Sequence, residues 1–250
     1  MVLPINRQNA IIRAVAEKHS ATVSELAEII DASESTVRRD LIELDKQGKL
    51  KKVRGGAAAV SDDFISLEPD VYTKQTLNVA EKDMIARYAA AQINKDDFVF
   101  IDAGTSTEKM IDYIETADAT YVTNGIAHAL KLLKKGFRTI IIGGALKPGT
   151  EAIIGANALN NLKQFNFTKA FIGTNGITVE NGFTTPDIEE AQLKKEAVER
   201  SYIAFVLADH TKFNKLSAVT FSPIDKACII TDMLPDKEFA KKTVIKEVAK

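Results

Sequence analysis

The stretch SESTVRRDLIELDKQGKLKKVRGGA, residues 33–57, decides the fold of the N-terminal part of the chain. Its first residue, Ser33, is a favourable helix cap, and the pattern that follows predicts a helix over residues 34–47. The apolar residues of this helix stand at the i, i+4, i+7 spacing of one buried face: Val37, Leu41 and Leu44. Gly48 suits the left-handed position just past a helix end. The stretch therefore begins as an amphipathic helix with a defined start and end.

A basic hairpin follows that helix, and two further helices precede it. Residues 49–53 read as a strand, and the glycine pair at 55–56 forms a turn. Upstream, Thr22 and Glu25 make the Thr-x-x-Glu capping box that opens a helix. The apolar stripes of the two upstream helices are supplied by Ile11, Ile12 and Val15, and by Val23, Leu26 and Ile30. With a short polar break at 31–33, the predicted order is helix, helix, turn, helix, hairpin.

Positive charge is concentrated in the same part of the chain. The whole sequence carries 33 Lys+Arg against 34 Asp+Glu, a formal net charge of −1, which excludes a uniformly basic nucleic-acid coat but not a basic patch. Residues 38–54 hold seven basic and three acidic side chains. The N-terminal end of the third helix presents hydroxyl and guanidinium groups, and in helix-turn-helix proteins that end enters the major groove.

Two interpretations fit this basic surface: an ordinary solvated helix and hairpin, or a DNA-binding winged helix-turn-helix. The capping box, short turn, Arg pair and basic hairpin together favour the second. In that interpretation Arg contacts guanine, Ser and Thr contact bases or phosphates, and the basic wing holds the DNA backbone. The candidate DNA-binding residues are Ser33, Ser35, Thr36, Arg38, Arg39, Lys51, Lys52 and Arg54.

Residues 33–57 resemble the N-terminal signature of the DeoR family of bacterial transcriptional regulators. The family pattern is S-x-x-T-[IV]-R-R-D-L-x-x-L, then a glycine-terminated turn and a basic wing that ends H-G-G-A. The chain follows this pattern, with Arg54 at the position where the family usually has His. The resemblance implies a winged helix-turn-helix DNA-binding domain, which we assign to residues 1–57.

The composition is that of a globular protein. The chain has 250 residues, 45% hydrophobic and 27% charged, which argues against wholesale disorder and allows one or two domains. A single cysteine, Cys228, excludes an intramolecular disulfide and a multi-cysteine zinc site. No apolar run approaches the ~18–20 residues that span a bilayer, and the N-terminus lacks the apolar region of a signal peptide. We expect a cytoplasmic protein with no membrane association, no cofactor and no metal.

The rest of the chain predicts an α/β fold. Pro69 and poor periodicity favour a linker over residues 58–75. Over residues 76–250, short apolar runs alternate with helical stretches; the runs lie at 98–102, 120–123, 139–142, 170–173, 203–208 and 227–231. This alternation predicts a Rossmann-like parallel sheet covered by helices on both faces.

Polar or glycine-rich segments follow five of these predicted strands. They are DAGTST at 102–107, TNG at 123–125, GG at 143–144, GTNG at 173–176 and DHTK at 209–212. In parallel sheets, ligands bind beyond the carboxyl ends of the strands. Gly104 lets backbone amides approach an anion, the residues at 105–107 add hydroxyl groups, and Lys212 offers positive charge. The loop is neither a Walker nor a G-x-G-x-x-G loop, and together these segments favour a phosphate site.

The blocks DAGTST, TNG, GG, FIGTNGI and ADHTKF, in that order, resemble the sensor domain of the DeoR family. That domain is related to ribose-5-phosphate isomerase, glucosamine-6-phosphate deaminase and CoA transferases, and its effectors are mostly phosphorylated sugars. The resemblance implies a pocket lined by Asp102, Gly104, Thr105, Ser106, Thr107, Thr123, Asn124 and Lys212. The segments SLEPD at 66–70 and GTNGITVENGFTTPDIEEA at 173–191 also resemble fructose-operon repressors of low-GC Gram-positive bacteria, which implies fructose 1-phosphate as effector.

Three functions are compatible with these features. The first is a repressor of a sugar-utilisation operon that binds operator DNA as a dimer or tetramer and responds to a sugar phosphate, with tagatose 6-phosphate an alternative to fructose 1-phosphate. The second is a sugar-phosphate isomerase or deaminase with a DNA-binding appendage, for which Asp102 is the best candidate base. The third is a nucleotide- or CoA-responsive regulator, which the absence of a dinucleotide loop disfavours. We expect the first, a regulator and not an enzyme.

Overall fold

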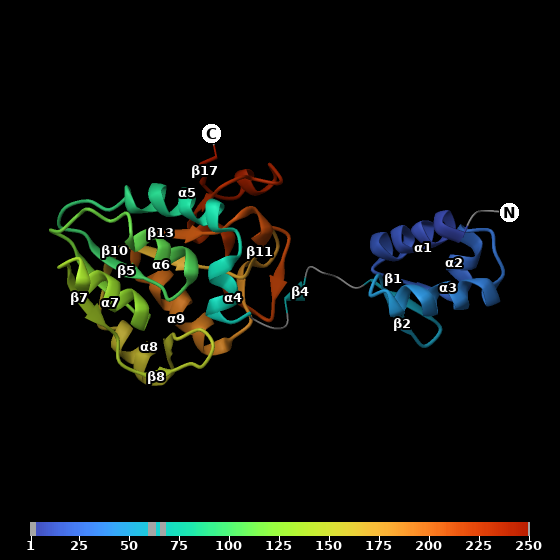
Figure 1. Ribbon diagram of the computed structural model, residues 1–250, viewed down its shortest axis with the longest axis horizontal. Helices are drawn as coiled ribbons and strands as arrows, with labels where there is room; N and C mark the ends of the chain where they lie inside the picture. Colours follow the sequence, from blue (N-terminus) through green and yellow to red (C-terminus); the bar gives the residue numbers. More distant parts are fainter. Residues whose placement is uncertain (1–3, 60–63, 66–68, 250) are drawn as a thin grey trace. The chain divides into compact units, whose positions relative to one another are not determined.

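The computed structural model describes residues 4–59, 64–65 and 69–249 (Figure 1). The first three residues of the SLEPD segment, at 66–68, lie outside the described residues. The chain divides into two compact units, Met1–Asp62 and Asp63–Lys250. Among the described residues, no helix has both the length and the apolar character needed to cross a membrane.

The N-terminal unit is a three-helix bundle with a small antiparallel sheet. Its elements are α1 (Pro4–Lys18), β1 (Ser20–Thr22), α2 (Val23–Ile29), α3 (Glu34–Lys46), β2 (Lys51–Val53) and β3 (Gly56–Ala58). The strands lie in the order β1-β3-β2. The predicted apolar faces of the three helices meet in one core, where Leu26, Val37 and Leu44 are fully buried. The predicted winged helix-turn-helix fold is thereby confirmed.

Short-range hydrogen bonds define the helix starts as the sequence predicts. Thr22 accepts the backbone N–H of Glu25, and the Glu25 carboxylate accepts the N–H of Thr22, so the capping box is complete. Ser33 likewise accepts a backbone N–H from the first turn of α3. Between helices, Arg7 donates from Nε and Nη2 to the two oxygens of the buried Asp40 carboxylate, at 2.5 and 3.0 Å. This bidentate pair fixes α1 against α3.

The two adjacent glycines of the wing serve different purposes. Gly55 has φ +85°, in the left-handed region that favours glycine. Gly56 pairs with Thr22 of β1, and a Cβ at position 56 would lie 2.2 Å from the carbonyl oxygen of Ala21. Strand β1 was not predicted, because three residues are too few to show an alternating pattern. The second glycine of the motif is therefore required by the close approach of β1.

The C-terminal unit is built on a seven-stranded parallel sheet, in the order β17-β16-β13-β10-β5-β6-β7 (Figure 1). The strands are β5 (Phe98–Ile101), β6 (Thr120–Thr123), β7 (Arg138–Ile141), β10 (Phe167–Gly173), β13 (Ser201–Leu207), β16 (Cys228–Thr231) and β17 (Ile245–Glu247). This confirms the predicted Rossmann-like architecture. Because all strands are parallel, their carboxyl ends lie along one edge of the sheet.

Helices cover both faces of this sheet and separate two apolar cores. On one face pack α5 (Val79–Ala90), α6 (Thr105–Ile111) and α7 (Ile126–Lys134). On the other face pack α8 (Ala156–Leu162) and α9 (Ile188–Glu199). The smaller elements, which were not predicted, are β4 (Phe64–Ile65), β8 (Ala145–Leu146), β9 (Ile153–Ile154), β11 (Gly176–Thr178), β12 (Gly182–Thr185), β14 (Leu216–Ser217), β15 (Val219–Ser222), η1 (His210–Lys212), η2 (Ile224–Lys226) and η3 (Phe239–Lys241).

A short helix, α4 (Val71–Thr76), begins within residues 58–75, where the sequence predicted a linker of poor periodicity, and ends one residue beyond it. Asp70 caps it by accepting the backbone N–H of Thr73 at 2.7 Å. The Val71 N–H donates to the carbonyl of Gly149 at 2.8 Å, which attaches α4 to the body of the C-terminal unit. Six residues make fewer than two turns, too few for an apolar stripe to appear in the sequence.

The turn between β5 and α6 rests on a buried histidine. His128 of α7 is 4% exposed, and its Nε2 lies 3.1 Å from the carbonyl oxygen of Gly104 and 3.2 Å from Oγ1 of Thr107. Burial lowers the pKa of His128 to about 4, against an opposing influence of the Glu108 and Asp102 carboxylates. The neutral imidazole therefore supports the turn at neutral pH.

We expect Gly56→Ala to destabilise the N-terminal unit. The added methyl group would overlap the backbone of β1, and overpacking of this kind costs about 1–3 kcal/mol. The effect is measured in the full chain as a decrease in the temperature or the denaturant concentration at which the N-terminal unit unfolds. Gly143→Ala is the control, because no atom lies within 4 Å of a Cβ placed there. Equal midpoints for the two variants would contradict the assigned packing.

We expect the C-terminal unit to lose stability as the pH falls from about 6.5 towards about 4. A histidine whose pKa is lowered in the folded state stabilises fully above its unfolded-state pKa, and this contribution disappears as the pH approaches the folded-state value. Urea unfolding at pH 7.5 and pH 4.5 measures the difference, which His128→Gln should reduce. The exposed His19 provides the control substitution His19→Gln. An undiminished pH dependence in His128→Gln would assign the acid sensitivity to other groups.

Candidate functional site

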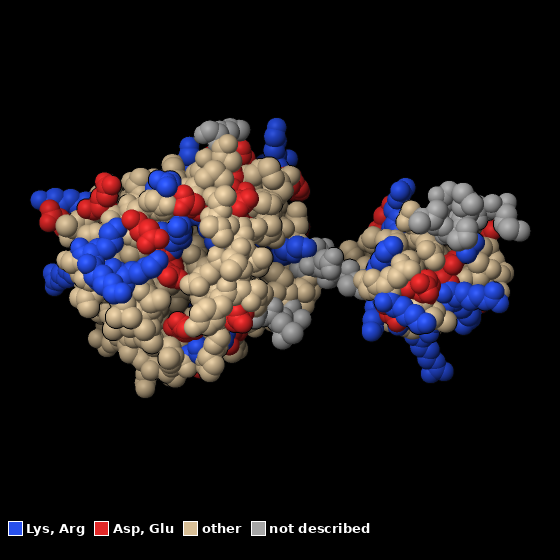
Figure 2. Space-filling view, viewed as in Figure 1, with Lys and Arg blue, Asp and Glu red and all other residues tan. Residues whose placement is uncertain are grey.

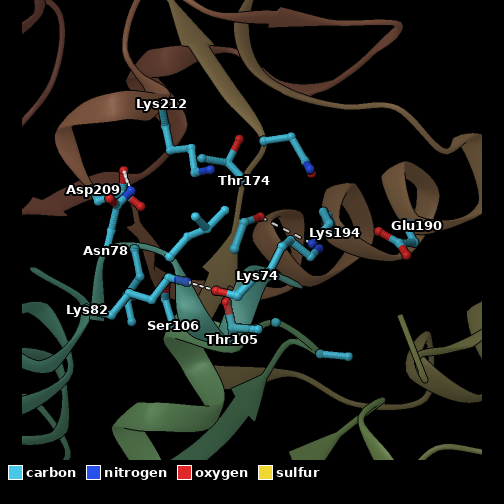
Figure 3. Close-up of a pocket in the computed structure, with 16 residues that line it drawn as sticks. Lys74, Asn78, Lys82, Thr105, Ser106, Thr174, Glu190, Lys194, Asp209 and Lys212 are labelled. Atoms are coloured by element: carbon cyan, nitrogen blue, oxygen red, sulfur yellow. Dashed lines mark hydrogen bonds between the residues drawn. The ribbon is translucent and has the colours of Figure 1, made fainter. Parts of the chain in front are cut away.

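The segments that follow β5, β10 and β13 meet in one cleft at the carboxyl edge of the sheet, whereas the predicted segments at 123–125 and 143–144 do not line it (Figure 3). Gly104 caps α6, Thr105 and Ser106 are the first residues of that helix, and Thr174 follows β10. Helix α9 contributes side chains from one side, and α4, α5 and η1 contribute them from the other. The cleft therefore gathers residues that are more than 100 positions apart in the sequence.

One end of the cleft is cationic. Lys74 of α4, Lys82 of α5 and Lys212 of η1 all line it, with Asp209 as the nearby carboxylate (Figure 3). The Lys82 ammonium donates to the carbonyl oxygen of Lys74. The backbone N–H of Lys212 donates to the carbonyl oxygen of Asp209, but its side-chain ammonium forms no hydrogen bond or ion pair with any other residue that the structure describes. Three ammonium groups in one cleft produce a positive potential that attracts anions.

The pKa of Lys82 reflects this crowding. Burial lowers it, the Asp209 carboxylate opposes that change, and the neighbouring Lys212 and Lys74 ammonium groups lower it further. Asp209 is itself held by the Asn78 side chain, whose Nδ2 donates to Oδ1 at 3.1 Å. An anion bound here would favour the charged form of Lys82 and raise its pKa.

A buried ion pair lies at the floor of the cleft. Asp102, at the end of β5, receives the Lys194 ammonium from α9 at 2.5 Å. Its Oδ2 also accepts the backbone N–H of Gly173 at 2.9 Å. The Asp102 and Lys194 side chains are only 3% and 5% exposed. The pair links β5, β10 and α9 at the point where the strands end.

At the end of the cleft that is lined by α9 lies the carboxylate of Glu190. Glu190 is 6% exposed, and its Oε1 accepts from Lys147 Nζ at 3.0 Å and from Thr150 Oγ1 at 2.9 Å. Asp187 caps α9 by accepting the backbone N–H groups of Glu189 and Glu190. Burial raises the pKa of Asp187, but those N–H groups and Lys147 outweigh it and hold the pKa below its ordinary value.

The eight residues predicted for effector binding separate into two groups. Four line the cleft: Gly104, Thr105, Ser106 and Lys212. The other four are buried beside or beneath it: Asp102, Thr107, Thr123 and Asn124. The Thr123 hydroxyl donates to the Ile101 carbonyl at 2.6 Å, and Asn124 Oδ1 accepts the Ala103 N–H at 2.7 Å. This second group positions the turn from below.

Sequence reasoning missed several residues of the cleft. Lys74 lies in the segment expected to be irregular, and Lys82 and Asn78 precede the first predicted strand. Glu190 and Lys194 are four residues apart on α9, so they share one face of that helix. A charged pair on the buried face of an amphipathic helix is the one signal that could have identified them.

The candidate DNA-binding residues lie on α3 and the wing of the N-terminal unit, where Figure 2 shows Lys and Arg side chains projecting from the surface. Ser33, Ser35 and Thr36 form a cluster of hydroxyl groups at the start of α3, with oxygen–oxygen distances of 2.9 Å. The remaining candidates are all exposed: Arg38, Arg39, Lys51, Lys52 and Arg54. Arg38 pairs with Glu34 at 3.0 Å, whereas Arg39 makes no side-chain hydrogen bond or ion pair within the described chain.

Two family descriptions match the chain. The DeoR-like helix-turn-helix domain matches residues 7–63, and the DeoR C terminal sensor domain matches residues 77–233. The chain is 42% identical to an uncharacterized HTH-type transcriptional regulator FruR of Bacillus subtilis, over 99% of both chains. It is 34% identical to the HTH-type transcriptional regulator IolR of the same species, over 89% of this chain and 88% of the relative.

Similarities at lower sequence identity include a further repressor and a solved structure. The lactose phosphotransferase system repressor of Staphylococcus aureus is 32% identical over 93% of each chain. Among solved structures, ribose 5-phosphate isomerase A of Methanocaldococcus jannaschii is 11% identical over 54% of this chain and 55% of its own, with a TM-score of 0.41, a likeness that says nothing of activity. The curated relatives are named as regulators and repressors, not as enzymes. With both of its domains matched, the chain belongs to the DeoR family of transcriptional regulators.

Proposed function

We propose that the protein represses a sugar-utilisation operon under the control of a phosphorylated sugar that binds in the cleft. The observation that carries this proposal is the convergence of Lys74, Lys82 and Lys212 at the carboxyl edge of the sheet. A phosphate dianion would neutralise much of the positive charge, and the hydroxyl groups of Thr105 and Ser106 would donate hydrogen bonds to it.

Fructose 1-phosphate is the effector we propose, with tagatose 6-phosphate as the alternative. The first is supported by the 42% identity to the regulator named FruR, and the second by the 32% identity to the lactose phosphotransferase system repressor. Both ligands present one phosphate and several hydroxyl groups. The cleft offers cations at one end and the carboxylate of Glu190 at the other, which suits that chemistry.

For the DNA-binding side, we propose that residues 1–57 bind operator DNA, residues 58–75 link the domains, and residues 76–250 sense the effector. Two or four chains present paired α3 helices to repeated half-sites. Effector binding changes operator affinity because it favours one arrangement of the DNA-binding domains, and a coupling of about 1–3 kcal/mol changes that affinity roughly 5–150-fold.

We expect Arg39→Ala to weaken operator binding about tenfold or more, because a bidentate contact to a base contributes about 1–3 kcal/mol. Fluorescence anisotropy with a duplex selected by the wild-type protein from a random library measures the affinity. Arg138→Ala is the control, since Arg138 is an exposed arginine of the C-terminal unit. The affinity for the effector should be the same in the wild type, Arg39→Ala and Arg138→Ala. Wild-type operator affinity in Arg39→Ala would remove this residue from the interface.

We expect a sugar phosphate to raise the unfolding temperature, and Lys212→Met to abolish that rise. A ligand at ~100 times its Kd adds about 2.7 kcal/mol of stability, a shift of several degrees. The panel is fructose 1-phosphate, fructose 6-phosphate, tagatose 6-phosphate, glucosamine 6-phosphate and free fructose, measured in EDTA. Lys226→Met, at an exposed position outside the cleft, is the control. A Lys212→Met protein that still responds normally would place the effector elsewhere.

A further inference from the structure

Glu190 presents one carboxylate oxygen to the cleft without a partner. Both of its donors, Lys147 Nζ and Thr150 Oγ1, bind the same atom, Oε1. Nothing in the described part of the chain donates to Oε2. The side chain is nonetheless 7% exposed and belongs to the lining of the cleft. Oε2 is not among the fully buried atoms that lack a partner in the described part of the chain, so it is open to the cleft and can accept a hydrogen bond from a ligand there.

The two donors also fix the direction of this oxygen. Lys147 lies 3.2 Å from Asp187 Oδ2 as well as 3.0 Å from Glu190 Oε1, so the ammonium is held between two carboxylates of the α9 N-terminal turn. With Oε1 anchored on Lys147 and Thr150, rotation of the carboxylate is restricted. Oε2 is therefore a preorganised acceptor, ready for a hydroxyl group.

The cleft is electrically asymmetric. In Figure 3, Lys82, Asp209 and Lys212 lie on one side, and Lys194 and Glu190 lie on the other. The first side holds Lys82, Lys212 and Asp209, and the Lys74 ammonium lies close enough to Lys82 to lower its pKa. On the second, Lys147 faces the two carboxylates of Asp187 and Glu190, and Lys194 is neutralised by Asp102. One end is thus net positive and the other net negative.

We infer that Glu190 determines which phosphorylated sugars the cleft accepts. This inference rests on the proposed function. The phosphate of the effector binds at the lysine end, and a hydroxyl group of the sugar donates to Glu190 Oε2 at the other end. The effector class is then a sugar monophosphate with free hydroxyl groups remote from the phosphate. A bisphosphate would place its second phosphate against the Glu190 carboxylate, and like-charge repulsion would reject it.

Glu190→Gln tests this assignment with little change of shape. The Gln carbonyl oxygen still accepts from Lys147 and Thr150, but a neutral amide replaces the free carboxylate oxygen. Isothermal titration with fructose 1-phosphate, fructose 1,6-bisphosphate and inorganic phosphate is carried out on the wild type and on Glu190→Gln. Glu189→Gln removes the same charge from the adjacent exposed residue and is the matched control.

The expected result has three parts. Fructose 1-phosphate binds Glu190→Gln about tenfold more weakly, because a charge-assisted hydrogen bond is lost. Inorganic phosphate, which occupies only the lysine end, binds both proteins equally. The preference for fructose 1-phosphate over fructose 1,6-bisphosphate shrinks in Glu190→Gln and stays unchanged in Glu189→Gln.

A second variant, Glu190→Asp, distinguishes a loss of the ligand contact from a general change in folding. Glu190→Asp keeps the negative charge but withdraws it from the ligand, so it should weaken fructose 1-phosphate binding while still rejecting the bisphosphate. Unaltered affinity and selectivity in both Glu190 variants would overturn this inference and leave the proposed function intact. A wild-type protein that binds no sugar phosphate of the panel would overturn both.

Discussion

The ammonium groups of Lys74, Lys82 and Lys212 share one cleft, and the mutual repulsion of these charges is the constraint on which the rest of the C-terminal unit depends. Each lysine comes from a different element, so the cleft exists only when α4, α5 and η1 are packed against the sheet. The lowered pKa of Lys82, caused by burial and by its two lysine neighbours, shows the cost of this arrangement. An anion would offset the repulsion, so the folded unit is prepared to gain from binding one.

Buried polar contacts hold the cleft open against that repulsion. The Asp102–Lys194 pair joins β5 to α9, and His128 supports the turn that begins α6. Removing one member of a buried pair leaves an uncompensated charge, which makes such pairs stringent constraints on local geometry. The floor of the cleft therefore depends on a buried ion pair and a buried histidine.

The sequence predicted the regular parts of the fold well, for identifiable reasons. The capping box at Thr22 and the apolar face of α3 are local patterns, and both appear in the structure. Six of the seven parallel strands were recognisable as short apolar runs, whereas the edge strand β17, which has only three residues, was not predicted. Short elements escaped detection: β1 has three residues and α4 six, so neither contains a full period of its pattern. Their existence depends on partners distant in the sequence, such as Gly56 for β1.

The candidate site was predictable in location but not in the roles of its residues. Thr105 and Thr107 are the same residue type in one turn, yet the Thr107 hydroxyl is used by the carbonyl oxygens of Asp102 and Gly104, whereas Thr105 faces the cleft. What separates them is whether the hydrogen-bonding capacity of each side chain is already filled, which only the three-dimensional structure reveals. The same criterion distinguishes the two oxygens of Glu190: Oε1 is filled by Lys147 and Thr150, and Oε2 is left to the cleft. At Thr105 and Glu190, hydrogen-bonding capacity that is left open towards the cleft, more than residue type, therefore distinguishes the cleft-facing groups from the structural ones.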